Sequence, residues 1–254
     1  MNRSKSVIQQ RRDAILEYIR SKDSDQLDIK QMAQELNVSE VTIRRDLSYL
    51  EFMGVIKRRY GKVSAVTNTE SNEASQSDDI LERIAGKAAE FVEDGDIIFL
   101  NTSITALRML KHIKAANVTV VTNNIFAANT PHRNDLTLIF TGGEVRYPKY
   151  AMVGDIAQRT IMSMKASKTF LGCSGLTIAN GMTTEHLSEV GVNELMLSQN
   201  GGEIFLLTNH FKLGVDSNFV SGNIRQIKTL ITDNDADPGI IEQFREAGLE
   251  IIQV

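Results

Sequence analysis

Apolar residues in the first quarter of the chain recur every three or four positions, which is the period of an amphipathic helix. This pattern predicts three short helices, over residues 6–21, 28–36 and 39–53. The second helix starts at Asp28, and Gln31 follows three residues later. The pair resembles a capping box, in which side chains near a helix start bond to backbone N–H groups that have no partner in the helix.

The third predicted helix follows a tight turn at Asn37–Val38 and has two unlike faces. Advancing about 100° per residue places Ile43, Leu47 and Leu50 on one side, so we expect them in the core. The N-cap, the opposite face and its flanks carry short or cationic side chains: Ser39, Val41, Thr42, Arg44, Arg45 and Ser48. Short residues let a helix approach the major groove, and arginines reach bases or phosphates, so this face predicts DNA contact.

A basic hairpin is expected after the third helix, which ends at Gly54. Residues 55–63 contain two short apolar stretches around a glycine, a pattern typical of a β-hairpin wing. The residues predicted to contact DNA there are Arg58, Arg59, Tyr60 and Lys62. Each cationic contact with a phosphate releases counterions, so the affinity for DNA should fall steeply with salt.

Beyond residue 80 the pattern changes to apolar runs that alternate with helices. Strands are expected at 96–100, 118–121, 136–140, 169–172, 204–207, 229–231 and 249–253, and helices at 80–92, 103–112, 155–164, 186–198 and 238–247. The alternation predicts an α/β fold: a doubly wound, mostly parallel sheet, preceded by the small winged helix-turn-helix. No G-x-G-x-x-G follows a predicted strand, so no dinucleotide site and no other cofactor is predicted.

Ligands of open α/β sheets bind at the carboxyl ends of the strands, and polar or glycine residues follow several of them here. These candidate effector-binding residues are Asn101, Thr102, Ser103, Thr105, Asn123, Gly142, Gly143 and Lys212. Hydroxyls at a helix start and a nearby lysine suit an anion such as phosphate. The two adjacent glycines permit close approach of a ligand to the backbone.

Several stretches of the sequence resemble the DeoR family of bacterial transcription regulators, and the resemblance covers nearly the whole chain. VSEVTIRRDLSYLEFMGVIKRRYGK at 38–62 resembles the family's winged helix-turn-helix, and VTVVTN at 118–123 and GMTT at 181–184 match further patterns. The resemblance implies a repressor of carbohydrate-metabolism genes. It also implies a C-terminal sensor domain, similar in fold to ribose-5-phosphate isomerase, that binds a phosphorylated sugar or related metabolite and thereby alters operator binding.

In that family the hydroxyl loop at 102–105 would hold the sugar phosphate, and Asn123, Gly142, Gly143 and Lys212 would line the pocket. The sequence departs from the family where Asp-x-Gly-Thr-Thr, an Asp before Lys-x-Phe, a Glu-x-Lys pair and an Asp before Lys-Phe-Gly are usual. The departing residues are Asn101, Ser103, Ile104, Ser167, Gly191, Asn193 and Asn209. Because ionisable positions have become neutral, we expect either a changed effector or a sensor that has lost sugar-phosphate binding.

The charge of the chain is divided unevenly along its length. The whole chain has a net charge of −4, but residues 1–62 carry +4 and residues 63–254 carry −8. Between the two parts, TNTESNEASQSDD at 67–79 has no aliphatic or aromatic anchor beyond one alanine, which is typical of a linker. We therefore predict a DNA-binding domain over 1–66, a linker over 67–79 and an effector-sensing domain over 80–254.

Other residues that could carry chemistry give weaker patterns. Cys173 follows an apolar stretch and is expected to be a buried packing residue, and the four histidines show no metal-ligand spacing. Glu185 and Glu189 are four residues apart and are expected on a solvated helix face. No apolar run approaches the ~18 residues of a membrane span, and the N-terminus lacks the apolar core of a secretory signal, so a cytoplasmic protein is expected.

An isomerase-like enzyme with an appended helical domain is the alternative function. Aldose–ketose isomerisation needs a carboxylate base, whereas Asn101, Ser167 and Asn209 are neutral where carboxylates would be expected, so we predict a protein that is not an enzyme. The expected partners are double-stranded operator DNA, a small-molecule effector and further copies of the chain in a homodimer or homotetramer. Two-fold dimers would read half-sites about one helical turn apart, or a multiple of that spacing.

Overall fold

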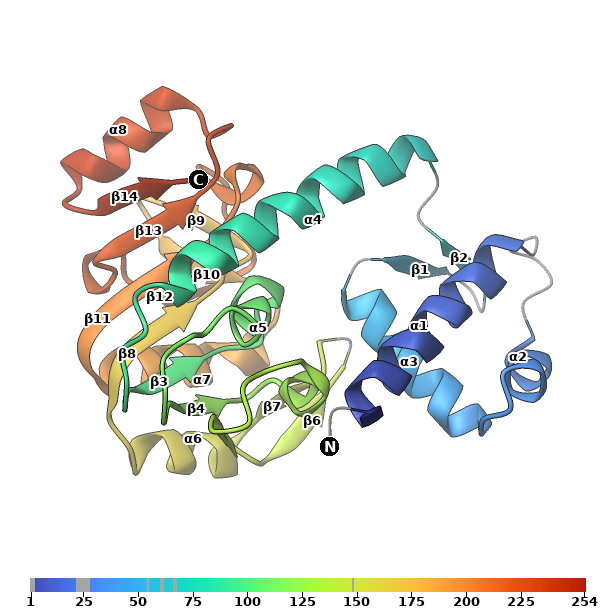
Figure 1. Cartoon of the computed structure of the whole chain (residues 1–254). Helices are drawn as coiled ribbons and strands as arrows, with labels where there is room; N and C mark the ends of the chain where they lie inside the picture. The colour runs from blue at the N-terminus through green and yellow to red at the C-terminus, as the bar shows by residue number, and fades with distance from the viewer. Residues whose placement is uncertain (1–2, 22–27, 54, 60–61, 66–67, 148) are drawn as a thin grey trace. The chain divides into compact units, whose positions relative to one another are not determined.

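The computed structural model describes residues 3–21, 28–53, 55–59, 62–65, 68–147 and 149–254. These residues form two compact units, Met1–Asp78 and Asp79–Val254. The first unit contains the helices α1 (Arg3–Ser21), α2 (Ile29–Glu35) and α3 (Glu40–Phe52) and a hairpin of β1 (Ile56–Arg59) and β2 (Lys62–Ala65) (Figure 1). The three helices and the antiparallel hairpin confirm the winged helix-turn-helix order expected from the sequence.

The core of the first unit contains the apolar stripe predicted for α3. Ile43 and Leu47 are fully buried and Leu50 is 4% exposed, and they pack with Ile15 of α1 and Met32 of α2. A helix–turn–helix arrangement follows because each short helix covers its apolar face only against the other two.

The starts of α2 and α3 are each fixed by a side-chain cap. The Asp28 carboxylate accepts the Lys30 backbone N–H at 2.8 Å, and the Ser39 hydroxyl accepts the Thr42 backbone N–H at 3.2 Å. The predicted capping box is incomplete, because the Gln31 amide donates instead to Glu35. Between the two helices, Asn37 adopts a φ of 51°, a left-handed conformation that asparagine tolerates better than most residues.

The second unit is built on a seven-stranded parallel sheet in the order β14-β13-β11-β8-β3-β4-β5. The strands are β3 (Ile97–Leu100), β4 (Thr119–Thr122), β5 (Thr137–Phe140), β8 (Ala166–Leu171), β11 (Asn200–Leu207), β13 (Thr229–Thr232) and β14 (Glu250–Gln253). The chain moves one way from β3 to β5 and then the other way from β8 to β14. The order therefore reverses between β3 and β8, where α/β sheets open a crevice for ligands.

Helices cover both faces of this sheet, which confirms the doubly wound α/β fold (Figure 1). They are α4 (Asn68–Ala89), α5 (Ile104–Met109), α6 (Asp155–Met162), α7 (Leu187–Ser198) and α8 (Pro238–Glu246). α4 and α5 lie together, since Glu82 accepts hydrogen bonds from Arg108, Lys111 and His112. Ile161, Met196 and Phe244 of the other three helices share the main core cluster.

The polar segment expected to be a linker is helical from residue 68 onward, because α4 begins at Asn68 rather than near Ile80. Its composition explains the difference. The segment lacks apolar anchors, but it also lacks proline and glycine, so it can continue the helical conformation of the packed part of α4. Absence of an anchor predicts weak packing and does not by itself predict absence of a helix.

Five short strands were not expected from the sequence. β6 (Glu144–Arg146) pairs with β7 (Ala151–Val153), and β10 (Gly181–Thr184) lies between β9 (Gly175–Thr177) and β12 (Phe219–Gly222). Each has three or four residues, and all four residues of β10 are buried, two of them threonines. Strands this short contain too few positions for a pattern of apolar and polar residues to be detected.

Candidate nucleic-acid interface and effector site

The outer face of α3 is cationic and largely exposed. Val41 is 72% exposed, and Arg44 and Arg45 are both exposed. The Arg44 guanidinium contacts Glu40, one turn earlier, with 2.9 Å between Nη2 and Oε2. Both partners are open to solvent, where such pairs contribute little, so a phosphate can replace the carboxylate. Ser39 and Thr42 are bonded to each other through their hydroxyls at the helix start.

The outward position expected for Ser48 is wrong. Ser48 is only 6% exposed, and its hydroxyl donates to the backbone carbonyl of Arg44 at 2.8 Å. A serine in a helix can bond back to the preceding turn in this way, which turns its hydroxyl away from the outer face. The exposed face of α3 therefore consists of its first two turns.

A buried carboxylate, which the sequence reasoning missed, joins α3 to α1. Asp46 is fully buried, and its two oxygens contact Arg11 Nε at 2.5 Å and Arg12 Nε at 3.2 Å. The Arg12 guanidinium also lies 3.4 Å from the centroid of the Tyr49 ring. On a helical wheel Asp46 lies about 60° from Ile43, so its position beside the buried stripe was a signal that could have been used.

The hairpin lies where the sequence predicts a wing. Arg59 of β1 pairs with Lys62 of β2, and Arg58 pairs with Val63, in antiparallel register. Only two residues separate the strands. Of these, Tyr60, which was predicted to contact DNA, lies outside the described residues.

At the reversal between β3 and β8, Asn101 bonds the two strand ends to each other. Its Nδ2 donates to the Gly172 carbonyl at 2.9 Å, and its Oδ1 accepts the Gly172 N–H at 3.0 Å. The same Nδ2 donates to Asn193 Oδ1 of α7 at 3.1 Å. Two of the positions that depart from the DeoR pattern are thus joined by a neutral amide–amide hydrogen bond.

The hydroxyl loop after β3 is closely packed. Thr102 and Thr105 are buried, and the Ser103 hydroxyl caps α5 by accepting the Ala106 N–H at 3.4 Å. α5 has six residues, so the expected anion site at a helix N-terminus lacks both a long helix and a free cap. Polar side chains, rather than the helix dipole, define the chemistry of this loop.

A buried carboxylate faces the loop, and the solvated position expected for it is wrong. Glu189 of α7 is 4% exposed, and its oxygens accept from Thr102 at 2.9 Å, Thr184 at 2.6 Å and Lys149 at 3.0 Å. The threonines come from two different strand ends and the lysine from the turn between β6 and β7. Glu185, by contrast, is exposed and lies before α7 begins.

The loop after β11 presents a second lysine at the same edge of the sheet. Lys212 donates from Nζ to the Cys173 carbonyl at 2.9 Å. Burial raises the pKa of the neighbouring Cys173 thiol. Cys173 packs against the main core cluster, as predicted, but it is only half-buried. His210 bonds to buried Asp233 through both its backbone N–H and its ring.

His210 and Asp233 also belong to a possible metal-binding group that the spacing of the histidines did not indicate. With Asp235, their potential ligand atoms lie within 4.8 Å of one another. The residues come from the ends of two neighbouring strands, so only the sheet order brings them together.

Three buried amide atoms at the carboxyl edge have no hydrogen-bond partner within the described part of the chain. They are Asn123 Oδ1, Asn124 Nδ2 and Asn209 Oδ1. The other amide atom of Asn123 donates to the Met152 carbonyl at 3.2 Å, so the orientation of this side chain is set. Buried polar atoms usually find partners, and a bound polar ligand is one source of them.

Some of the remaining predicted residues lie at the carboxyl edge of the sheet, and others lie away from it. Gly142 and Gly143 follow β5 with φ values of 69° and 103°. A side chain at Gly143 would lie 2.4 Å from the Val153 carbonyl, so packing against β7 already requires glycine there. Ser167 lies at the amino end of β8, where its hydroxyl donates to Asp96 at 2.7 Å. Gly191 contacts Gln158 of α6, so neither of these two belongs to the cluster around Glu189.

No helix within the described residues is both long enough and apolar enough to cross a bilayer.

The fold and the two sites together define a DNA-binding unit joined to a ligand-binding α/β unit. The DeoR-like helix-turn-helix domain matches residues 11–69, and the DeoR C terminal sensor domain matches residues 79–234. The chain belongs to the DeoR family of transcription regulators.

Named relatives align over most of this chain and of their own length. A lactose phosphotransferase system repressor from Lactococcus lactis is 30% identical over 86% of this chain and 89% of the relative. The transcriptional regulator GolR of Listeria innocua is 29% identical, covering 90% and 92%. The regulator IolR of Bacillus subtilis is 28% identical, covering 87% and 89%.

Among solved structures, the chain is similar to a ribose 5-phosphate isomerase from Plasmodium falciparum, with a TM-score of 0.36 and 14% identity over 52% of this chain and 51% of that one. It is also similar to the translation initiation factor eIF-2B of Pyrococcus horikoshii, with a TM-score of 0.43 and 12% identity over 88% and 86%.

Proposed function

We propose that this regulator represses carbohydrate-metabolism genes by binding an operator through α3 and the β1–β2 wing. The observation that carries the proposal is the exposed Val41, Arg44 and Arg45 face at the start of α3. This helix is fixed against α1 by the buried Asp46, as a reading helix must be to place its side chains in the major groove. The repressor named among its relatives supports the direction of regulation.

We further propose that the effector is a phosphorylated sugar or a related metabolite bound at the carboxyl edge of the sheet. Lys149 and Lys212 supply positive charge for an anionic group. The unpartnered carbonyl oxygens of Asn123 and Asn209 are acceptors that ligand hydroxyls can satisfy. A neutral Asn101–Asn193 pair at the strand reversal supports an effector that differs from the usual one of the family.

Thermal unfolding of the full chain with a panel of phosphorylated and unphosphorylated sugars and polyols tests the effector. A ligand present at about 100 times its dissociation constant stabilises the folded state by about 2.7 kcal/mol, which a melting experiment resolves. Binding should weaken in Lys212→Met and remain in Lys165→Met, which removes an exposed lysine elsewhere in the unit.

Two outcomes of the panel would count against this effector proposal. Strong stabilisation by an ordinary pentose or hexose phosphate would contradict a changed effector. No stabilisation by any compound of the panel would contradict an intact sugar-phosphate sensor and favour one that has lost the ligand.

We propose no catalytic role for the sensor unit. Glu189 is the buried carboxylate that faces the hydroxyl loop, so it is the candidate for a general base. Its two oxygens, however, accept hydrogen bonds from Thr102, Thr184 and Lys149. These three donors occupy both carboxylate oxygens, so neither oxygen is free to contact a substrate as a base must. Turnover of an aldose phosphate by the full chain, abolished in Glu189→Gln, would overturn this assignment.

A further inference from the structure

The turn between β6 and β7 contacts α7 at the strand-end site through a lysine side chain. Lys149 of this turn donates from Nζ to Glu189 Oε2 at 3.0 Å. The lysine side chain is 30% exposed, whereas the carboxylate side chain is 5% exposed. Lys149 is therefore the solvent-facing partner of the pair, and a ligand entering from solvent can reach its ammonium group.

The hairpin that carries Lys149 is attached to the end of β4. The Met152 N–H donates to the Asn123 carbonyl at 2.8 Å, and Asn124 forms a β-bridge with Ala151. Asn123 Oδ1 and Asn124 Nδ2 are both buried without a partner in the described part of the chain. A polar ligand bound beside the hairpin would supply the missing partners.

Aromatic contacts and an unusual backbone conformation fix the turn at Tyr150, the residue after Lys149. Tyr150 has a φ of 55°, which a bulky side chain rarely adopts. The centroid of its ring lies 4.9 Å from that of Phe126 and 4.6 Å from that of Tyr147. Such strain persists only where neighbouring contacts enforce it, so the packing of Tyr150 sets the direction in which Lys149 leaves the turn.

A second lysine bears on the same place. Lys212 donates from Nζ to the Cys173 carbonyl at 2.9 Å, which is an uncharged partner. Burial raises the pKa of the Cys173 thiol, while the positive charges of Lys212 and Lys149 both act in the opposite direction. The two ammonium groups therefore lie within electrostatic reach of one thiol, where a single anion can be shared between them.

We propose that Lys149 exchanges partners when the effector binds: its ammonium leaves Glu189 and, together with Lys212, holds a phosphoryl group of the effector. The proposal rests on the proposed function and adds the regulation of the same site. A phosphoryl group carries a charge of about −1.5 to −2 at neutral pH and accepts through three oxygens, so it competes well with a single carboxylate.

The exchange leaves the buried carboxylate with hydrogen-bond donors. Glu189 still accepts from the hydroxyls of Thr102 and Thr184, which come from two strand ends. The ion pair between the β6–β7 turn and α7, however, is broken. A filled site thus differs in structure from an empty one, which a sensor requires if its ligand is to favour one arrangement of the chain.

Titration of the full chain with inorganic phosphate at constant ionic strength, followed through the melting temperature, tests the exchange, and acetate is the comparison anion. Phosphate should stabilise the wild type and acetate should not. Lys149→Met should weaken phosphate binding by about tenfold or more, because it removes a charge-assisted hydrogen bond. Glu189→Gln should instead strengthen phosphate binding, because no carboxylate then competes for Lys149. An ion pair that is only structural would weaken binding in both variants.

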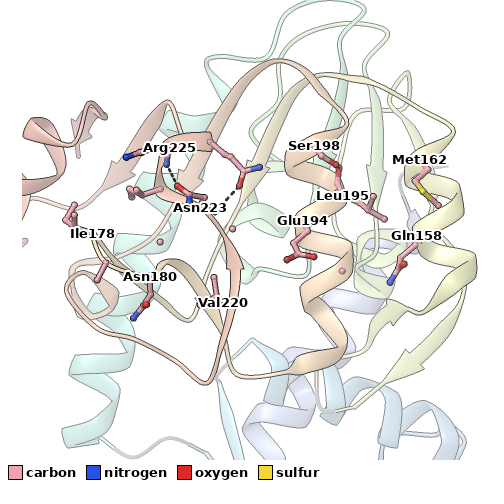
Figure 2. Close-up of a pocket in the computed structure, with 16 residues that line it drawn as sticks. Gln158, Met162, Ile178, Asn180, Glu194, Leu195, Ser198, Val220, Asn223 and Arg225 are labelled. Carbon is pink, nitrogen blue, oxygen red and sulfur yellow. Dashed lines mark hydrogen bonds between the residues drawn. The ribbon is translucent and has the colours of Figure 1, made fainter.

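Arg225 provides the matched control for binding at any exposed cation. It lies in another hollow of the sensor unit, a groove of about 980 Å³ lined by residues of α7 and of η4 (Ile224–Gln226) (Figure 2). None of the residues that line this groove belongs to the cluster around Glu189. Arg225→Met should therefore bind phosphate like the wild type.

Three results would overturn the proposal: a wild type that phosphate does not stabilise, Lys149→Met that binds phosphate like the wild type, or Glu189→Gln that does not bind it more tightly. Circular dichroism monitors the fold of each variant, and if Lys149→Met failed to fold, the sign of the Glu189→Gln effect would still decide. Failure of the exchange is separate from failure of the proposed function. A sugar phosphate that stabilises wild type and Lys149→Met equally would overturn only the exchange.

Discussion

Single polar side chains hold the sensor unit together where its strand order reverses. Asn101 bonds to both backbone groups of Gly172 and to Asn193, so one amide satisfies partners just after β8 and on α7. The sequence indicated Asn101 as a site residue because it follows a strand. It could not indicate the bonds, since they join residues 71 and 92 positions apart.

Asn101→Ala should lower the free energy of unfolding by about 2–3 kcal/mol, because it leaves buried groups of Gly172 and Asn193 without partners. Urea unfolding of the full chain measures this change. Asn134→Ala is the matched control, since that asparagine is exposed and its loss should change little. Equal stability of the two variants would show that the Asn101 bonds carry no net stabilisation.

The carboxylate of Asp96 makes stability depend on pH. Burial alone would raise its pKa, but hydrogen bonds from Lys168, the Glu93 backbone and Ser167 lower the pKa below its ordinary value of 3.8. The unfolded chain therefore takes up a proton at higher pH than the folded chain. The stabilisation is complete above pH 3.8 and is lost as the pH falls through the lower folded pKa.

Asp96→Asn should therefore be less stable than wild type at neutral pH, and the difference should shrink as the pH falls below 3.8. Melting temperatures of both proteins over an acid pH series measure it. A difference that stays constant throughout that series would contradict the lowered pKa.

At the scale of elements, the apolar pattern predicted every strand of the parallel sheet and all eight α-helices of the described residues to within several residues, apart from the early start of α4. The same pattern did not predict which residues from distant parts of the chain lie together. Ser167 belongs to a strand of the parallel sheet, but it lies at the amino end of β8. It is therefore away from the site, which lies at the carboxyl ends of the strands. The four-residue spacing of Glu185 and Glu189 predicted a solvated helix face. Spacing does not show which residues pack against α7, and Glu189 is buried.

One buried carboxylate adds a polar contact to the apolar packing between α1 and α3. Asp46→Ala should destabilise the first unit by about 3–5 kcal/mol, because it leaves Arg11 and the buried Arg12 without their partner. Glu17→Ala, an exposed position on α1, serves as the control. Thermal unfolding followed by circular dichroism gives the comparison, and a loss no larger than that of the control would refute an anchoring role for Asp46.

At the scale of the whole molecule, the net charge of −4 hides two parts of opposite sign. The basic part coincides with the helix-turn-helix match and the acidic remainder with the sensor match. Binding of an effector in one part can alter operator binding in the other only if the effector prefers one arrangement of the chain. By linkage, operator DNA must then change effector affinity by the same factor.

The central claim is that α3 reads DNA, and it is tested most directly by the affinity of the full chain for a genomic fragment that the wild type enriches. Arg44→Ala/Arg45→Ala should lose most of that affinity and show a shallower salt dependence, by about 0.9 in log–log slope for each phosphate contact removed. Arg159→Ala/Arg245→Ala, which removes two exposed arginines of the sensor unit, should bind like wild type. Equal affinities of the α3 variant and wild type would contradict the account.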